Sequence, residues 1–360
     1  MRRICGFCLF FFLFNASLCG QDTLVEEGEI GGAAFRIQIP ADWKGGLVMY
    51  AHGYRPRDGG WYPLNGMLCA VFLDRGYAVA ESGYSRQGWA LEEAVAETDA
   101  LRQYFVKTHG HVSKTFVTGH SMGGAITVAI IETFPEHYDG ALPMCGPLLP
   151  AIHFFKDPVF DMLVTFEALF AKALPDELKP VVESKSLPRE AIGRALASDA
   201  DLAGRFAGHW RIREADLVEI LCLYHMLYRE LVDRAGGNPI DNRNTVYMGI
   251  EPIRETKARV RRYEAAPEAL DYVRRHYTPT GKIEDPVLAV HTAYDPGVPP
   301  GLANFYAVTS ALRGCEDLFV HKYVDAEGHC NIAPEFVGRA FDQLVLWAVE
   351  KKRPEPGLLQ

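Results

Sequence analysis

Two patterns of apolar and polar positions organise the first 146 residues. Residues 33–40 alternate apolar and polar side chains, which is typical of a half-exposed antiparallel strand. Four short apolar runs are typical of strands with little exposure: 47–51, 77–80, 115–118 and 141–145. Three other segments are predicted to be helices: 64–75, 91–108 and 124–131. Strands that alternate with helices predict a mostly parallel sheet with helices on both faces.

This alternation stops after residue 146 and returns only at residue 286. Helices with charged faces are predicted from about residue 147 to 250, and they include 159–173, 189–196 and 215–235. From residue 286 on, two strands are predicted at 286–292 and 318–324. A final helix is predicted at 334–351 and a loose tail at 354–357. We therefore predict one α/β domain, formed by residues 21–146 and 281–360, with a helical cap inserted at 147–280.

The first 20 residues have the pattern of a secretory signal peptide. Arg2 and Arg3 precede the apolar run 4–14, and small and polar residues follow it. The run is too short to span a membrane, and no other stretch is long and apolar enough, so no integral membrane span is expected. Residues 16–19 also resemble a lipid-attachment motif, but Leu18 fits it poorly, so a lipid anchor at Cys19 is the weaker alternative. We expect a secreted or periplasmic protein.

The charge of the chain restricts its partners. The net charge is -9, and removal of residues 1–20 takes away two arginines and no acidic residue, which gives -11. An acidic chain without a basic patch is poorly suited to bind nucleic acid or an anionic membrane surface, so neither partner is expected.

The cysteines give no sign of a metal site. Five of the eight follow the predicted signal peptide: Cys69, Cys145, Cys222, Cys315 and Cys330. They show neither the Cys-x-x-Cys nor the Cys/His spacing of a zinc site, so we expect no bound metal. Export permits a disulfide. Cys315 and Cys330 flank the same predicted strand and are the one pairing that the sequence suggests, with ordinary buried thiols as the alternative.

Residues 119–123 (Gly-His-Ser-Met-Gly) are the strongest indication of catalytic chemistry in the chain. They lie between the predicted strand 115–118 and the predicted helix 124–131. A Gly-x-Ser-x-Gly at a strand-to-helix turn is the setting of a nucleophile elbow, which projects the serine hydroxyl above the edge of the sheet. The flanking glycines are expected because a Cβ there would collide with neighbouring backbone. The pattern predicts that Ser121 is a nucleophile.

A serine nucleophile needs a histidine to take its proton and a carboxylate to orient that histidine. In a fold with such an elbow the expected order along the chain is Ser, then Asp or Glu, then His. Asp295 follows the next-to-last predicted strand and His329 follows the last one, so both fit this order. The other acidic candidates are less suitable: Asp285 lies at the wrong end of its strand, and Asp325 and Glu327 are too close in sequence to His329.

Two backbone N–H groups are predicted to form an oxyanion hole. Met122 supplies one, because it is the residue after the nucleophile. Tyr54 is expected to supply the other from residues 52–54 (His-Gly-Tyr), which end the predicted strand 47–51. Gly53 would let the backbone come close to the substrate carbonyl. An ordinary turn after a strand is the alternative interpretation of residues 52–54.

Together these segments resemble the α/β-hydrolase superfamily, in particular its exported esterase-like members. The resemblance rests on residues 52–54, residues 119–124, Asp295 with Val298 and Pro299, and Gly328 with His329. It covers roughly residues 30–146 and 280–352. It implies the α/β-hydrolase fold, with a mostly parallel central sheet and a helical cap in the position of the insertion. It does not imply a substrate, because the same fold serves esterases, peptidases, lipases and thioesterases.

The sequence as a whole predicts an exported serine hydrolase that cleaves carboxylic esters without a cofactor. Aromatic and aliphatic residues of the predicted cap favour a substrate, small or oligomeric, with an apolar or aromatic part, although core packing is the alternative for most of them. Gln87 and Trp89 are candidates for substrate contact, with a plain surface loop as the alternative. A serine exopeptidase or amidase is the nearest rival function, and a non-catalytic binding protein is the second.

Overall fold

The computed structural model describes residues 23–249 and 253–360. The predicted signal peptide, residues 1–20, and Cys19 lie outside the described residues. The chain forms two compact units. The sheet unit comprises residues up to Leu148, Pro279–Ala293 and Pro300–Gln360, and the helical unit comprises Leu149–Thr278 and Tyr294–Pro299. No helix in the described part of the chain has the length and apolar character needed to cross a membrane.

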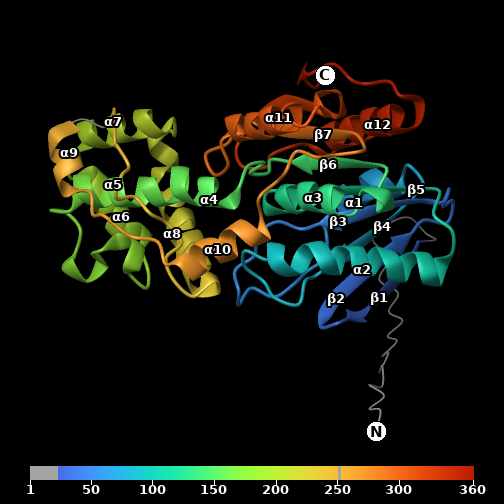
Figure 1. Cartoon of the computed structure of the whole chain (residues 1–360), viewed down its shortest axis with the longest axis horizontal. Helices are drawn as coiled ribbons and strands as arrows, with labels where there is room; N and C mark the ends of the chain where they lie inside the picture. The colour runs from blue at the N-terminus through green and yellow to red at the C-terminus, as the bar shows by residue number, and fades with distance from the viewer. Residues whose placement is uncertain (1–22, 250–252) are drawn as a thin grey trace, which may run out of the picture. The chain divides into compact units, whose positions relative to one another are not determined.

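One sheet dominates the sheet unit (Figure 1). Its nine strands among the described residues have the order β1-β2-β4-β3-β5-β6-β7-β8-β9. Their bounds are β1 Leu24–Ile30, β2 Ala33–Ile39, β3 Gly46–Ala51, β4 Tyr77–Ser82, β5 Lys114–His120, β6 Gly140–Met144, β7 Val287–Tyr294, β8 Phe319–Glu327 and β9 Gly357–Leu358. Strand β2 is antiparallel to both β1 and β4, whereas the pairs from β4 through β3, β5 and β6 to β7 are parallel. The predicted mostly parallel sheet is confirmed.

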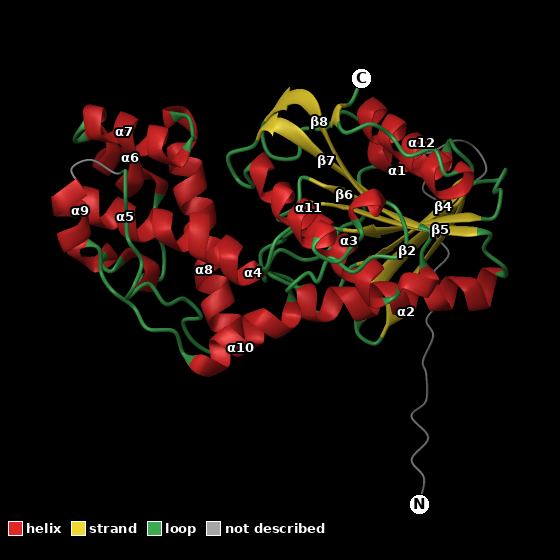
Figure 2. Ribbon diagram, turned by 45° about the horizontal axis from the view of Figure 1, so that its top comes forward, coloured by secondary structure: helices red, strands yellow, loops and turns green. Residues whose placement is uncertain are grey.

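Helices cover both faces of this sheet (Figure 2). Their bounds are α1 Gly66–Leu73, α2 Leu91–His109, α3 Met122–Thr133, α11 Ala303–Ala311 and α12 Pro334–Glu350. On one face α1 packs on α12, where Phe341 makes edge-to-face contacts with Phe72 at 5.1 Å and with Phe116 of β5 at 5.4 Å between ring centroids. Such aromatic burial is a large share of the stability of a core. Because the strands from β4 through β3, β5 and β6 to β7 are parallel, their C-terminal ends lie at one edge of the sheet.

The C-terminal tail differs from the prediction. Residues 354–357 were expected to be loose, but Gly357 and Leu358 pair with β8 as the short strand β9. Leu359 N–H also donates to Tyr323 O at 2.8 Å, and Lys322 Nζ donates to Glu355 O at 2.6 Å. The tail is ordered because its backbone completes the edge of the sheet and the Leu359 side chain is buried.

Most of the helical unit, Leu149–Thr278, lies between β6 and β7 in the chain. Its helices are α4 Ala151–Phe154, α5 Asp161–Phe170, α6 Arg189–Ala197, α7 Ala200–Trp210, α8 Leu217–Ala235, α9 Ile253–Arg259 and α10 Pro267–His276. A kinked segment, Phe155–Phe160, with extended backbone at Asp157, joins α4 to α5. The aromatic rings pack on one another inside this unit: Phe154 on Phe155, Phe160 on Tyr228, and Phe166 on both Phe170 and Phe206. These aromatic side chains therefore form the core of the helical unit.

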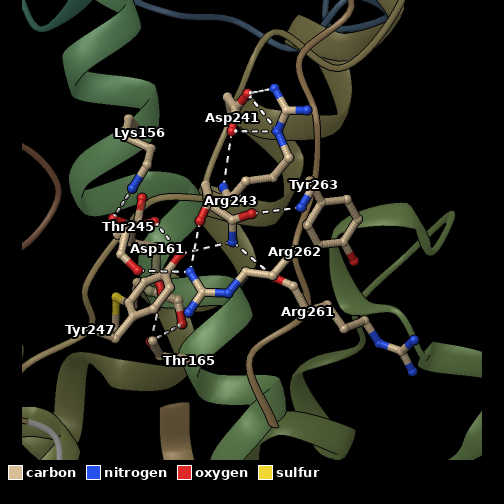
Figure 3. Close-up of polar contacts among 12 residues, drawn as sticks. Lys156, Asp161, Thr165, Asp241, Arg243, Thr245, Tyr247, Arg261, Arg262 and Tyr263 are labelled. Carbon is tan, nitrogen blue, oxygen red and sulfur yellow. Dashed lines mark hydrogen bonds and ion pairs between the residues drawn. The ribbon is translucent and has the colours of Figure 1, made fainter. Parts of the chain in front are cut away.

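A network of polar contacts attaches the loop that follows α8, which contains Asn242, Thr245 and Tyr247, to the start of α5 (Figure 3). The buried carboxylate of Asp161 accepts hydrogen bonds from Lys156 Nζ at 2.5 Å and from Tyr247 OH at 2.9 Å. Burial raises the pKa of Asp161 despite the attraction of Lys156. Arg262 Nη1 donates to the backbone oxygens of Asn242 and Thr245 at 2.7 and 2.8 Å. These contacts hold the loop in one conformation through partnered polar groups rather than through apolar packing.

Candidate active site

Ser121 lies in a sharp turn between β5 and α3. Its backbone angles are φ 58° and ψ -126°. This region is rarely adopted by residues with a Cβ and costs on the order of 1–3 kcal/mol. Ser121 N–H donates to Met144 O at 2.9 Å and Gly124 N–H donates to Ser121 O at 2.8 Å, which holds the strained turn in place. A strand, turn and helix therefore stand where the sequence predicts a nucleophile elbow.

Gly119 and Gly123 allow this turn to lie against the end of β3. A Cβ at Gly119 would lie 2.4 Å from Ala51 O, and a Cβ at Gly123 would lie 2.0 Å from the same oxygen. Both distances are far below van der Waals contact with a backbone atom that cannot rotate away. The two glycines are required for the close approach of the turn to the neighbouring strand.

Replacing Gly123 with alanine is expected to destabilise the sheet unit by about 3 kcal/mol, because backbone has to move to accommodate the methyl group. Chemical denaturation of the purified protein measures this loss. The matched control is Gly193→Ala in α6, where an added Cβ meets nothing within 4 Å. That substitution is expected to be neutral or stabilising by about 0.5–1 kcal/mol. Equal stability of the Gly123→Ala protein and the wild type would contradict the close packing of the elbow.

His329 meets Ser121 in the structure. It follows β8 and Gly328, and its Nε2 lies 2.8 Å from Ser121 Oγ, although the two residues are 208 positions apart in sequence. Thr292 Oγ1, on β7, donates to Gly328 O at 3.1 Å and holds the backbone directly before the histidine. A hydroxyl within hydrogen-bond distance of an imidazole nitrogen is the geometry of a nucleophile with its base. The two residues predicted to react together are therefore neighbours.

A disulfide joins Cys330 to Cys145. Cys330 directly follows His329, and Cys145 directly follows β6, whose Met144 O accepts the Ser121 N–H. The suggested pairing of Cys315 with Cys330 is therefore wrong, and so is the alternative that all five cysteines are ordinary thiols. The Cys315 thiol instead donates to the backbone oxygen of Ile283 at 3.5 Å. The sequence carried no signal for the true pair, because 185 positions separate its members.

Reduction of this disulfide is expected to lower both stability and turnover. Loss of a native disulfide typically costs about 2–5 kcal/mol, and a displacement of about 1 Å in a catalytic group can lower the rate by about 100-fold. Turnover of an ester and the melting temperature, each with and without a phosphine reductant, measure the two effects. The variant Cys145→Ser/Cys330→Ser should behave like the reduced wild type and ignore the reductant. The control Cys315→Ser should stay sensitive to the reductant; an insensitive control would speak against the role of this disulfide.

Asp295 directly follows β7 and is 3% exposed. Its Oδ1 accepts the N–H groups of Gly297 and Val298, both at 2.9 Å, so the side chain shapes its own turn. The segment Tyr294–Pro299 belongs by its contacts to the helical unit, where Tyr224 OH donates to Gly297 O at 3.1 Å. The pairing of Asp295 with His329 remains a prediction.

Gly53 lies against the elbow. A Cβ at this position would lie 3.0 Å from His120 O and 3.3 Å from Ser121 Cβ, so the lack of a side chain permits the close approach that the sequence suggested. Tyr54 follows on the same backbone, and Met122 is the first residue of α3. Donation by the N–H groups of Tyr54 and Met122 to a substrate oxygen remains a prediction.

Two other histidines near the elbow are held in the neutral form. Burial, and then repulsion from Arg55, lower the pKa of His52 to about 3. Burial, and then repulsion from His329, lower the pKa of His120 to about 4. The His52 ring stacks on Tyr84 at 4.0 Å, and its Nδ1 lies 2.8 Å from Gly53 O. Both rings are therefore uncharged near pH 7 and serve as structural supports of the elbow.

The predicted substrate contacts at Gln87 and Trp89 remain predictions. Both lie between β4 and α2, as the sequence indicated. Gln87 Nε2 donates to Gly83 O at 2.5 Å, and Trp89 is buried. Each side chain thus has a structural role. Among residues 23–249 and 253–360, no three histidine, cysteine or carboxylate side chains gather in a way that could hold a metal ion.

Comparisons with known proteins identify the fold. No family model matches the chain, and no curated protein matches it in sequence. Among solved structures, feruloyl esterase B from Aspergillus oryzae superposes with a TM-score of 0.54 at 12% identity, covering 92% of this chain and 82% of that chain. Est1E from Butyrivibrio proteoclasticus gives 0.42 at 13% identity, covering 91% of this chain and 99% of that one.

A puromycin hydrolase also matches, with a TM-score of 0.45 at 15% identity over 94% of this chain. This chain spans only about two fifths of that protein, since 41% of its length is covered. At such low identities the likeness concerns the fold alone. The chain has the α/β-hydrolase fold.

Proposed function

We propose that the protein is an exported serine hydrolase that cleaves carboxylic esters. The observation that carries this proposal is the 2.8 Å contact between His329 Nε2 and Ser121 Oγ at a strained strand-to-helix turn. Strain of this kind at a reactive side chain points to function, because a folding chain gains nothing from it. Export is supported by the signal-peptide pattern and by the Cys145–Cys330 disulfide, since disulfides persist in oxidising compartments.

In the proposed mechanism, Ser121 Oγ attacks the ester carbonyl while His329 Nε2 takes its proton. The N–H groups of Met122 and Tyr54 stabilise the negative charge on the carbonyl oxygen, an effect worth about 2.7–4 kcal/mol for a donor of this kind. His329 then gives the proton to the leaving alcohol, and an acyl group remains on Ser121. Water, activated by His329, releases the acid and restores the serine. Asp295 orients the imidazole through its Nδ1 and stabilises the charged form.

The proposed preference of the protein for ester over amide substrates can be tested directly. The test compares kcat/KM for p-nitrophenyl esters with kcat/KM for amino-acyl p-nitroanilides. Feruloyl esters belong in the same panel, because a protein of this fold bears the name feruloyl esterase B. The proposal expects the esters to be the better substrates. Faster cleavage of the anilides would favour an exopeptidase or amidase. A protein that cleaves neither class, and whose Ser121 is not labelled by a fluorophosphonate probe, would be a non-catalytic binding protein.

A further inference from the structure

A buried carboxylate contacts both ends of the loop that carries Tyr54. This loop, residues 52–64, connects β3 to α1 and is called the oxyanion loop below. Glu81 lies at the C-terminal end of β4, next to β3, and is 2% exposed. At the far end of the loop, Glu81 Oε2 accepts the N–H of Leu64 at 2.6 Å. A short bond from a carboxylate to a backbone donor fixes the position of that backbone.

Arg55 connects the same carboxylate to the near end of the loop. It directly follows Tyr54, is 8% exposed, and places Nη2 3.9 Å from Glu81 Oε1. Its guanidinium lies 3.8 Å above the ring of Tyr62, a residue of the same loop. Its backbone oxygen accepts the N–H of Gly88 at 2.8 Å. The residue next to the predicted oxyanion donor thus has a ring contact and a backbone hydrogen bond, and its guanidinium faces the Glu81 carboxylate at ion-pair distance.

Burying the charged groups of Glu81 and Arg55 costs folding free energy. Burial raises the pKa of Glu81 to about 7, against the opposing effects of Leu64 N–H and Arg55. Arg36 and Tyr50 lie opposite Glu81 on the neighbouring strands. A buried pair of charges often adds less stability than well-packed apolar side chains would. Fixing a particular backbone position is therefore a better explanation for its presence than stability.

We propose that Glu81 and Arg55 are positioning residues that hold Tyr54 N–H where it can stabilise the oxyanion. This inference rests on the proposed function and adds a role for two residues outside the triad. The pair fixes the oxyanion loop at its two ends, while Gly53 brings the same backbone against Ser121. A donor that is fixed before the reaction stabilises developing charge without reorganisation during it. Loosening the loop should therefore weaken binding of the transition state and leave binding of the substrate nearly unchanged.

The test uses Glu81→Gln, Arg55→Met and the double variant in the full mature chain. Glutamine is expected to fold, because it has nearly the same shape as glutamate and can still accept the Leu64 N–H. It removes only the negative charge that faces Arg55. Removal of an oxyanion donor costs about 100- to 1,000-fold in kcat, so a displaced donor should cost about 10- to 100-fold. KM should stay within about twofold of the wild-type value. The double variant should lose about as much as either single variant, because the two residues act as one pair.

A trifluoromethyl ketone supplies a second readout, because it forms an oxyanion on the attacking serine. Its inhibition constant should rise in Glu81→Gln and Arg55→Met by about the factor by which kcat/KM falls. The matched control is Asp99→Asn in α2, a carboxylate that is 1% exposed and whose partners include Arg102, Gln103, His137 and Tyr138. This control should lower the melting temperature and leave kcat unchanged.

The outcomes separate this inference from the function on which it rests. A wild-type protein that cleaves no ester and is not labelled at Ser121 by a fluorophosphonate contradicts the proposed function. An active wild type whose folded Glu81→Gln or Arg55→Met variants keep kcat and the inhibition constant contradicts only the role of the pair. An increase in KM at constant kcat would also overturn it, since that result would assign the pair to substrate binding.

Discussion

Replacing Ser121 with alanine is expected to lower kcat for ester hydrolysis by about 10⁶-fold, because His329 then has no hydroxyl to activate. The fold should remain intact, since alanine keeps the Cβ and the backbone of the turn. Steady-state hydrolysis and a thermal melt of the same preparation measure both effects. Retained hydrolysis with an unchanged melting temperature would show that another group is the nucleophile.

The variant Ser121→Gly distinguishes the loss of the reactive hydroxyl from the relief of backbone strain at residue 121. The turn holds residue 121 at φ 58° and ψ -126°, which glycine adopts more readily than serine or alanine. Ser121→Gly should therefore be as inactive as Ser121→Ala but more stable than the wild type by about 1 kcal/mol. A glycine variant that is less stable than the alanine variant would argue against strain at the elbow.

Replacing Asp295 with asparagine is expected to lower kcat by about 10⁴-fold, because an amide at this position favours the wrong tautomer of the catalytic histidine. Asparagine keeps an oxygen that can accept the N–H groups of Gly297 and Val298, so the turn should survive. KM should change little, since the acid does not touch the substrate. Values of kcat and KM for a single ester, measured with protein of wild-type melting temperature, check this.

The control for this prediction is Asp325→Asn. Asp325 is an exposed residue of β8, close in sequence to His329, and is one of the acids that compete with Asp295 in the sequence. It should show wild-type kcat. An inactive Asp325→Asn protein beside an active Asp295→Asn protein would reverse the assignment of the acid.

The sequence predicted the sheet and the elbow because both depend on local patterns. Buried parallel strands need continuous apolar runs, and the turn at Ser121 needs glycines where a Cβ would strike Ala51 O. The helices at Pro267–His276 and Ala303–Ala311 were not predicted, nor was the first strand, Leu24–Ile30. That strand is an edge strand with partly exposed residues throughout, so its apolar signal is weak.

Other features of the site depend on contacts between distant residues. The partner of Cys330 was missed because only the folded sheet brings the end of β6 close to the loop after β8. Glu81 and Arg55 gave no signal either, since charged residues after a strand usually face solvent. Their burial becomes visible only when the oxyanion loop folds back on β4.

The segment that carries Asp295 is fastened to the helical unit by two tyrosines. Tyr224 of α8 donates to the backbone oxygen of Gly297, and Tyr294 donates to the carboxylate of Asp216 at 2.6 Å. An engineer who exchanged this helical insertion for one from another hydrolase would therefore also exchange the anchors of the proposed catalytic acid. Chimeras designed to acquire a new substrate range should lose turnover unless the donor insertion brings equivalent tyrosines or Tyr294–Pro299 is transplanted with it.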